Sequence, residues 1–220
     1  MVKNMKDPLD MRCSAILVLS AIDGLGKYLA VTEAQMEEVL HIERHTHETQ
    51  ASRYNREERE EDQSMLNDLD NLYETELYPA MRYSFVVLLH IFTETRLRKF
   101  CSELQDERHV PIGVTDLSGS AIERIRTFLT KLAGVSVKDF PEKEWESLQN
   151  LQKIRDCIVH AYGHVKDSRD GPWLRKFASS KNAVSIGDDG RLQIELEFCQ
   201  QQLDNLRRLF ESLFQTLGWA

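Results

Sequence analysis

The residues of this 220-residue sequence that could do chemistry are Arg155, Asp156, His160 and Tyr162, which lie in one short segment, residues 145–162. The same segment carries apolar residues that recur at helical spacing, so one of its faces is expected to be buried. These apolar residues are Leu148, Leu151, Ile154 and Ile158. A strongly basic side chain and a histidine next to core positions need an explanation that core packing does not supply.

The four polar side chains suit the cleavage of RNA, which carries its own nucleophile in the 2′-hydroxyl. A metal-free nuclease has to remove the hydroxyl proton, stabilise the phosphorane and protonate the leaving 5′ oxygen. His160 suits the proton steps because a histidine titrates near neutral pH, and Arg155 can hold two phosphate oxygens. Tyr162 could hydrogen-bond the phosphate or orient His160. Asp156 could fix Arg155 or the imidazole tautomer.

The run from Arg155 to Gly163 resembles the signature of the HEPN superfamily, an Arg, then a polar residue, then a His a few positions on. In one branch a Tyr follows two residues after the His, as Tyr162 does here. The polar residue is often Asn in the family, and here it is Asp156. The likeness covers residues 76–220 in layout and rests on residues 145–165 in identity.

This resemblance implies a mainly α fold, an antiparallel HEPN-like helical bundle. It also implies a metal-independent RNA endonuclease, a toxin or defence protein, that works without a cofactor as a homodimer with both motifs facing one cleft. Some relatives in the Tyr-bearing branch are silenced by a partner protein that modifies the tyrosine. By that likeness Tyr162 would be the target of an antitoxin or modifying partner.

Helix geometry supports a site shared by two chains. Five residues at 100° each place Arg155 and His160 about 140° apart on an ideal helix, so the two side chains do not share a face. One histidine per chain is also too few to act as acid and base at once. A two-fold axis would supply a second histidine, and this is the commonest oligomer symmetry.

The local charge around the motif favours a phosphate partner. The whole chain has a net charge of −8, which argues against broad, sequence-blind nucleic-acid binding. Residues 153–181 nevertheless hold seven Lys or Arg and three Asp, which gives +4. Trp173 lies in this span and could stack on bases. The candidate substrate-binding residues are Lys153, His164, Lys166 and Arg169. An ordinary solvated loop would give the same pattern.

The elements that must position this motif form a single domain, with an N-terminal helical extension over residues 1–75 and the motif-bearing bundle over residues 76–220. A helix over residues 11–30 is weakened or divided by Gly24 and Gly26, and a capping box at Thr32 opens a second helix. Residues 33–70 predict a long solvated helix or helix pair, of which residues 53–62 are charged all round.

The bundle itself is predicted as a series of helices and one hairpin. A central helix over residues 80–104 begins at Pro79, and Glu94 and Arg96 are expected to form structural ion pairs with their neighbours. Further helices follow a capping box at Ser120, the Phe140-Pro141 step and residue 198, and a loop broken at Gly171-Pro172 separates the motif from a β-hairpin over residues 183–196.

Metal binding, disulfides and membrane insertion are not expected. The four cysteines, Cys13, Cys101, Cys157 and Cys199, lie far apart and predict buried reduced thiols. His41 and His45 have the spacing of a helical metal pair, but Glu43 and His47 do not share their face, so exposed histidines are expected. No apolar run approaches the roughly 20 residues that span a bilayer, and residues 15–19 are too short for a signal core. We therefore expect a cytoplasmic protein.

Two alternatives remain open from the sequence. The first is a non-catalytic HEPN-like module in which Arg155 and His160 bind a nucleotide or brace a dimer or another protein interface. The second is a helical scaffold that binds a protein partner through residues 53–62.

Overall fold

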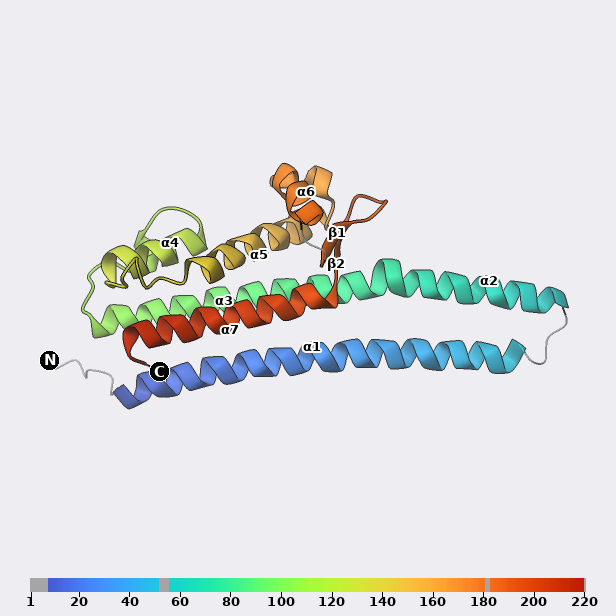
Figure 1. The fold of residues 1–220 in the computed structure, drawn as a ribbon, viewed down its shortest axis with the longest axis horizontal. Helices are drawn as coiled ribbons and strands as arrows, with labels where there is room; N and C mark the ends of the chain where they lie inside the picture. The colour runs from blue at the N-terminus through green and yellow to red at the C-terminus, as the bar shows by residue number, and fades with distance from the viewer. Residues whose placement is uncertain (1–7, 52–55, 181–182, 220) are drawn as a thin grey trace.

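The computed structural model describes residues 8–51, 56–180 and 183–219, and these are almost entirely helical (Figure 1). The elements in chain order are α1 (Pro8–Ala51), α2 (Arg56–Leu72), a π-helix (Tyr73–Leu77), α3 (Tyr78–Glu107), a 3-10 turn (Val114–Asp116), α4 (Ala121–Thr127), a π-helix (Phe128–Leu132), α5 (Glu142–Ala161), a 3-10 turn (Val165–Asp167), α6 (Gly171–Ser180), β1 (Val184–Ile186), β2 (Leu192–Ile194) and α7 (Leu196–Leu217). The predicted mainly α fold, with a small hairpin before the C-terminal helix, is confirmed.

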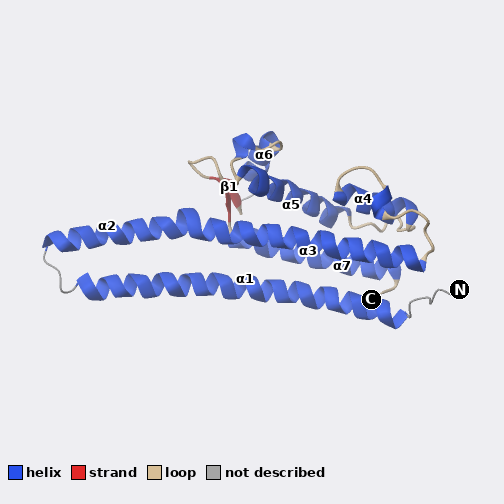
Figure 2. Cartoon of the chain, turned by 180° about the vertical axis from the view of Figure 1, so that it is seen from behind, coloured by secondary structure: helices blue, strands red, loops and turns tan. Residues whose placement is uncertain are grey.

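Two long antiparallel rods set the shape of the molecule. α1 forms one rod, and α2, the π-helix and α3 form the other without a break (Figures 1 and 2). The helices α3, α5 and α7 pack on one another, and α1 packs along α7 and α3. Beyond the end of this bundle α1 and α2 continue as a two-helix arm (Figure 2). Residues 53–55 of the charged segment at 53–62 lie outside the described residues.

The predicted break in the first rod is absent, and α1 is one continuous helix. Thr32 does not cap a new helix, because its hydroxyl donates to the Tyr28 carbonyl at 2.8 Å, one turn back. Gly24 and Gly26 lie within the helix, although each glycine costs about 1 kcal/mol relative to alanine there. Tertiary packing outweighs that cost, because α1 buries Ala15, Val18, Ile22 and Leu29 in the core.

The stretch before the hairpin was also predicted wrongly as a loop, because Gly171 and Pro172 begin helix α6. Proline suits the first turn of a helix, where its missing N–H is not needed. A Cβ on Gly171 would lie 2.5 Å from the Val165 carbonyl oxygen, so glycine lets the helix start this close to the preceding turn. Leu174 then anchors α6 in the core with no exposed surface.

Other local predictions are confirmed. Ser120 and Glu123 form the reciprocal capping box, with the Glu123 amide donating to Ser120 Oγ at 3.3 Å and the Ser120 amide donating to Glu123 Oε2 at 2.8 Å. The hairpin pairs Val184 with Ile194 and Ile186 with Leu192. Its loop, residues 187–191, is the predicted Gly-rich turn.

A buried ion pair ties the rods together beside the hairpin. The guanidinium of Arg82 on α3 makes two hydrogen bonds with the carboxylate of Glu33 on α1, at 2.8 and 3.1 Å. The same guanidinium donates to the Ile194 carbonyl at 3.2 Å. Glu33 is only 5% exposed, so this pairing satisfies a charge inside the bundle.

All four cysteines lie within the described residues and are free thiols. Cys101, Cys157 and Cys199 are buried as predicted, whereas Cys13 is exposed. Burial raises the pKa of the Cys199 thiol to about 12, so this thiol is protonated at neutral pH.

Among the described residues, one helical segment could cross a membrane, judged by its length and composition alone. This segment is the part of α1 from Arg12 to Gln50. Its best window has a mean hydropathy of 1.5 and is 22% buried in the bundle. A mostly buried core helix of a soluble protein passes the same test, and so does a signal sequence near the N-terminus. α1 contributes residues such as Ile22 and Leu29 to the core. The fold is therefore compatible with a soluble protein.

Candidate functional site

Arg155 and Asp156 form a partly buried ion pair on α5, next to His90 of α3. Arg155 Nη1 donates to Asp156 Oδ1 at 2.7 Å, and the two side chains are 25% and 22% exposed. Of the two roles expected for Asp156, this geometry shows the first, which is to hold Arg155. The guanidinium keeps a solvent-accessible edge, so an incoming anion could share it or displace the carboxylate.

His90 on α3 is a neighbour of this pair that the sequence reasoning missed. It is 1% exposed, and neither ring nitrogen has a hydrogen-bond partner among the described residues. The Nε of Arg155 is likewise buried and without a partner there. Burial lowers the pKa of His90, and the nearby charge of Arg155 lowers it further, against the opposing effects of Glu94 and Asp156. His90 is therefore neutral at pH 7, and its ring can accept a hydrogen bond from a guanidinium.

The only sequence signal for His90 is a histidine inside the most apolar part of a helix, residues 85–92. That signal is weak, because a buried histidine in a helix is most often a satisfied core residue. What distinguishes His90 is the lack of a partner, and the sequence does not reveal it.

His160 lies in the last turn of α5 and is exposed to solvent. α5 is a regular helix from Glu142 to Ala161, so Arg155 and His160 point about 140° apart around its axis, as expected from their spacing. No hydrogen bond joins them within the described chain. A single copy therefore presents the two groups on different parts of one helix surface.

Tyr162 ends α5 in the left-handed conformation, with φ 49° and ψ 37°, and its amide donates to the Cys157 carbonyl. The ring is 63% exposed, with the Arg191 guanidinium 6.0 Å from the ring centroid. Arg191 is itself held by Glu76 at 2.8 Å and by Asp189. The phenol is thus accessible, and its ring is steadied by a cation from the hairpin.

The end of α5 is fixed by a close contact with α3 and the hairpin. Gly163 has φ +81°, and a Cβ there would lie 2.2 Å from the Tyr83 hydroxyl. The Tyr83 hydroxyl donates to the Leu192 carbonyl, and the Leu192 amide donates to the Gly163 carbonyl at 3.0 Å. Three elements therefore meet at one point immediately after the motif and set its position.

The four predicted substrate-binding residues do not converge on one point. Lys153 lies over the Trp173 ring, with its Nζ 4.4 Å from the centroid. Lys166 is exposed on the 3-10 turn, and Arg169 is exposed and pairs with Asp170 at 3.6 Å. His164 is half-buried, and its Nδ1 has no partner among the described residues.

Glu94 and Arg96 have separate contacts. Glu94 accepts from Arg98 at 2.9 Å, one turn along α3, while Arg96 lies over the Phe92 ring at 5.2 Å. Glu94 therefore makes the expected ion pair with a neighbour, and it also contributes negative charge near His90.

Two apolar side chains beside the Arg155 pair are only partly covered. Ile91, which follows His90, is 51% exposed, and Val159, one turn after Arg155, is 50% exposed. Such residues are individually ordinary on a protein surface. They lie on α3 and α5, the two helices that carry His90 and Arg155.

The histidines of α1 do not gather into a metal site in the described part of the chain. His41 and His45 are exposed one turn apart, and His47 is half-buried. Within residues 8–51, 56–180 and 183–219, no group of three or more His, Cys, Asp or Glu side chains is placed to hold a metal ion.

Comparisons with protein-family models, with curated proteins and with solved structures gave no significant match.

Proposed function

We propose that the chain is a cytoplasmic, metal-independent RNA endonuclease of HEPN type, a toxin or defence protein that acts as a homodimer. The observation that carries the proposal is the arrangement on the last three turns of α5. There an accessible Arg155–Asp156 pair, a solvent-exposed His160 and an exposed Tyr162 follow one another on a rigidly anchored helix.

Each side chain has a role in this reaction. His160 takes the proton of the 2′-hydroxyl, and His160 of a second copy protonates the leaving 5′ oxygen. Arg155 neutralises the charge that develops on the phosphorane. Asp156 holds the guanidinium until the phosphate arrives, and His90 offers a neutral acceptor for the unpartnered Arg155 Nε when it turns.

A second copy is needed because a single chain holds Arg155 and His160 on divergent faces of α5. A two-fold axis near the C-terminal end of α5 would bring one chain's arginine toward the other chain's histidine. It would also cover Ile91 and Val159, which are half exposed in the single chain. Tyr162 stays accessible at the rim, where a partner protein that modifies its hydroxyl would block the site.

The test is cleavage of a fluorogenic single-stranded RNA in the presence of EDTA. We expect the wild-type protein to cleave and His160→Ala to lose activity by about 10²- to 10⁴-fold, the usual effect of removing a general acid or base. His41→Ala is the matched control, because His41 is an exposed histidine of α1 and no part of the motif. Equal activity of wild type and His160→Ala would reject the proposal.

The second candidate is a non-catalytic HEPN-like module that binds a nucleotide or a protein. One observation favours it, which is that the charge of Arg155 is already balanced within the chain by Asp156. In that case the wild type would cleave no RNA, and Arg155→Ala would lower the melting temperature of the fold or of a dimer.

A further inference from the structure

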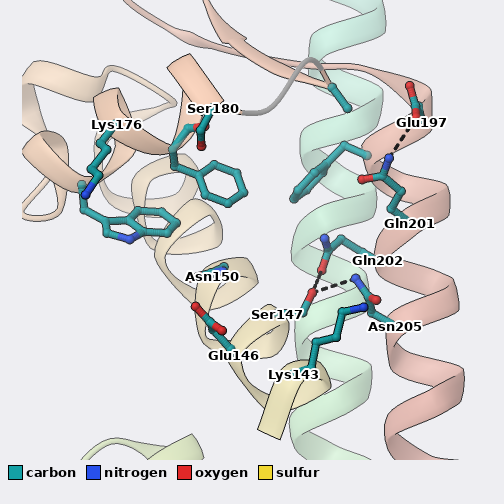
Figure 3. Close-up of a pocket in the computed structure, with 14 residues that line it drawn as sticks. Lys143, Glu146, Ser147, Asn150, Lys176, Ser180, Glu197, Gln201, Gln202 and Asn205 are labelled. Atoms are coloured by element: carbon teal, nitrogen blue, oxygen red, sulfur yellow. Dashed lines mark hydrogen bonds between the residues drawn. The ribbon is translucent and has the colours of Figure 1, made fainter.

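A groove of about 710 Å³ lies between α5, α6 and α7, on the face of α5 that runs toward α6 (Figure 3). It is open to solvent and large enough for a planar ring and its substituents. Its lining combines aromatic side chains from α6 and α7 with amides from α5 and α7. The lining includes Ser147, Asn150, Trp173, Phe177, Gln201 and Gln202.

The aromatic part of the groove is a short stack. Trp173 and Phe177 on α6 have ring centroids 4.8 Å apart with 23° between their planes. Phe177 then meets Phe198 of α7 edge-on, with centroids 6.4 Å apart. This arrangement holds the rings in fixed positions along one wall. Phe198 is only 2% exposed and Lys153 Nζ lies 4.4 Å from the Trp173 centroid, so a flat ligand would pack on the partly exposed Phe177 or displace the Lys153 ammonium from Trp173.

The opposite wall is made of amides with spare hydrogen-bonding capacity. Ser147 Oγ donates to Gln202 Oε1 at 3.0 Å and accepts from Asn205 Nδ2 at 2.8 Å, so these three side chains hold one another in place (Figure 3). Asn150 lines the same groove, and its side-chain amide makes no hydrogen bond within the described ranges. Gln201 Nε2 donates to Glu197 Oε1 at 2.9 Å, and the side-chain oxygen of Gln201 remains free to accept a hydrogen bond among the described residues.

The charge of the groove selects against ions. Lys143 and Lys176 are balanced by Glu146 and Glu197, so the lining carries no net charge. A phosphate or an ammonium ligand would find no excess of the opposite charge. The chemistry instead fits an uncharged planar ring whose edge carries both donors and acceptors, which describes a nucleobase.

The groove is within reach of the motif along one helix. At 1.5 Å per residue, Asn150 lies about 7.5 Å before Arg155 and about 15 Å before His160 along the axis of α5. Around the axis, at 100° per residue, Asn150 points about 140° away from Arg155 and about 80° away from His160, so the strand has to curve around α5 between the groove and the motif. Successive stacked bases of one strand are about 3.4 Å apart, so this separation corresponds to a few nucleotides. Lys153 lies between the groove and Arg155 in the sequence of α5, where a backbone phosphate would pass.

We propose that this groove is a nucleobase-binding subsite, which holds one base of an RNA strand a few nucleotides from the bond cleaved at the motif. The inference rests on the proposed function for the identity of the ligand as RNA. The aromatic wall covers the face of the base, and Asn150 and Gln201 read its edge.

The test measures binding without cleavage. A fluorescein-labelled hexanucleotide of 2′-O-methyl RNA carries no 2′-hydroxyl, so the intact wild-type protein can be titrated with it by fluorescence anisotropy. We expect Asn150→Ala to raise the Kd by about two- to tenfold, the effect of one lost hydrogen bond. Asn71→Ala, the same substitution at an exposed position of α2, should leave the Kd unchanged.

A second probe separates base from backbone recognition. A hexamer of the same backbone whose sugars carry no bases should bind wild type and Asn150→Ala equally, and more weakly than the normal hexamer binds wild type. The subsite is overturned if Asn150→Ala binds the normal hexamer as the wild type does, or if wild type binds neither probe.

The two proposals fail in distinguishable ways. Binding that depends on Asn150 without any RNA cleavage would keep the subsite and reject the nuclease. Cleavage that depends on His160, with base binding unaffected by Asn150→Ala, would keep the nuclease and reject the subsite.

Discussion

Tyr162 occupies a backbone conformation that suits glycine, although an L-residue there costs roughly 1–2 kcal/mol. The side chain buries little surface to offset that cost, since it is 63% exposed. Strain that stability does not explain is a reason to expect a function at the residue. In the proposed reaction the phenol contacts phosphate or His160, which requires it to stand out at the end of α5.

We predict that Tyr162→Gly raises the free energy of unfolding by about 1 kcal/mol, because glycine adopts positive φ without strain. The same variant should cleave RNA more slowly, since the hydroxyl is lost. Urea unfolding and the RNA assay measure the two effects, with Tyr162→Phe as the control that keeps the ring. A fall in stability in Tyr162→Gly would show that the ring supports the fold.

His90 makes a separate prediction about pH. Its pKa in the folded chain lies below the value of about 6.5 in an unfolded chain. The unfolded state therefore binds more protons as the pH falls through 6.5, so the contribution of His90 to stability is complete above that pH and is lost below it. In the pH range between the lowered pKa of folded His90 and 6.5, the slope is at most about 1.4 kcal/mol per pH unit.

His90→Gln removes this titration while it keeps a polar side chain. The free energy of unfolding of the wild type should then fall more steeply between pH 7 and 5 than that of the variant, whatever their absolute stabilities. Urea titrations at several pH values give both slopes. Parallel pH profiles would mean that His90 is protonated in the folded chain as easily as in the unfolded one.

At the scale of elements, the function depends on where α5 ends, and Gly163 fixes that point. We predict that Gly163→Ala destabilises the protein by about 2–5 kcal/mol, through the strain of φ +81° and the clash with the Tyr83 hydroxyl. Gly24→Ala is the matched control. Gly24 lies inside α1 with open space around it, so alanine should stabilise the helix by about 1 kcal/mol. Thermal unfolding of both variants measures the two changes in stability. A Gly163→Ala variant as stable as the wild type would refute the anchoring role of Gly163.

The elements that the sequence predicted well are those set by local patterns. The Ser120 capping box, the hairpin and the amphipathic helix α7 depend on neighbouring residues, and the structure contains all three. The Thr32 box has the same sequence pattern but forms no cap, because the buried residues of α1 hold the helix straight through it. α6 was missed because Gly171 and Pro172 also mark loops, and only its contacts with the core decide for a helix.

Only part of the candidate site could be predicted from the sequence. The helix that carries the motif follows from the spacing of its apolar residues, and so does the divergence of Arg155 and His160. The choice of these residues as a site rests on the family resemblance of residues 145–165. His90 and the groove next to Asn150 do not follow from the sequence, because they arise where separate helices meet. Helix α6 forms one wall of the groove. Because the sequence pattern did not predict α6, it could not predict the groove.

At the scale of the molecule, the chain is an elongated bundle in which α1 reaches from the core to the tip of a two-helix arm (Figure 1). The two ends of α1 therefore lie far apart along the molecule (Figure 1). The groove lies between α5, α6 and α7. The arm exposes apolar residues such as Val39 and Ile42. The motif lies at the end of α5 near the hairpin, and Arg191 links Tyr162 to Glu76 of the π-helix that continues into the arm.

The central claim is that the reacting groups come from two chains. The most direct measurement is RNA cleavage in EDTA by mixtures of wild-type and His160→Ala protein, refolded or exchanged together at a constant total concentration. If each site needs a histidine from both chains, activity follows the square of the wild-type fraction, so an equal mixture keeps about one quarter of the activity. Activity proportional to the wild-type fraction, about one half in that mixture, would contradict the shared site, and EDTA-resistant cleavage that is undiminished in pure His160→Ala would contradict the nuclease itself.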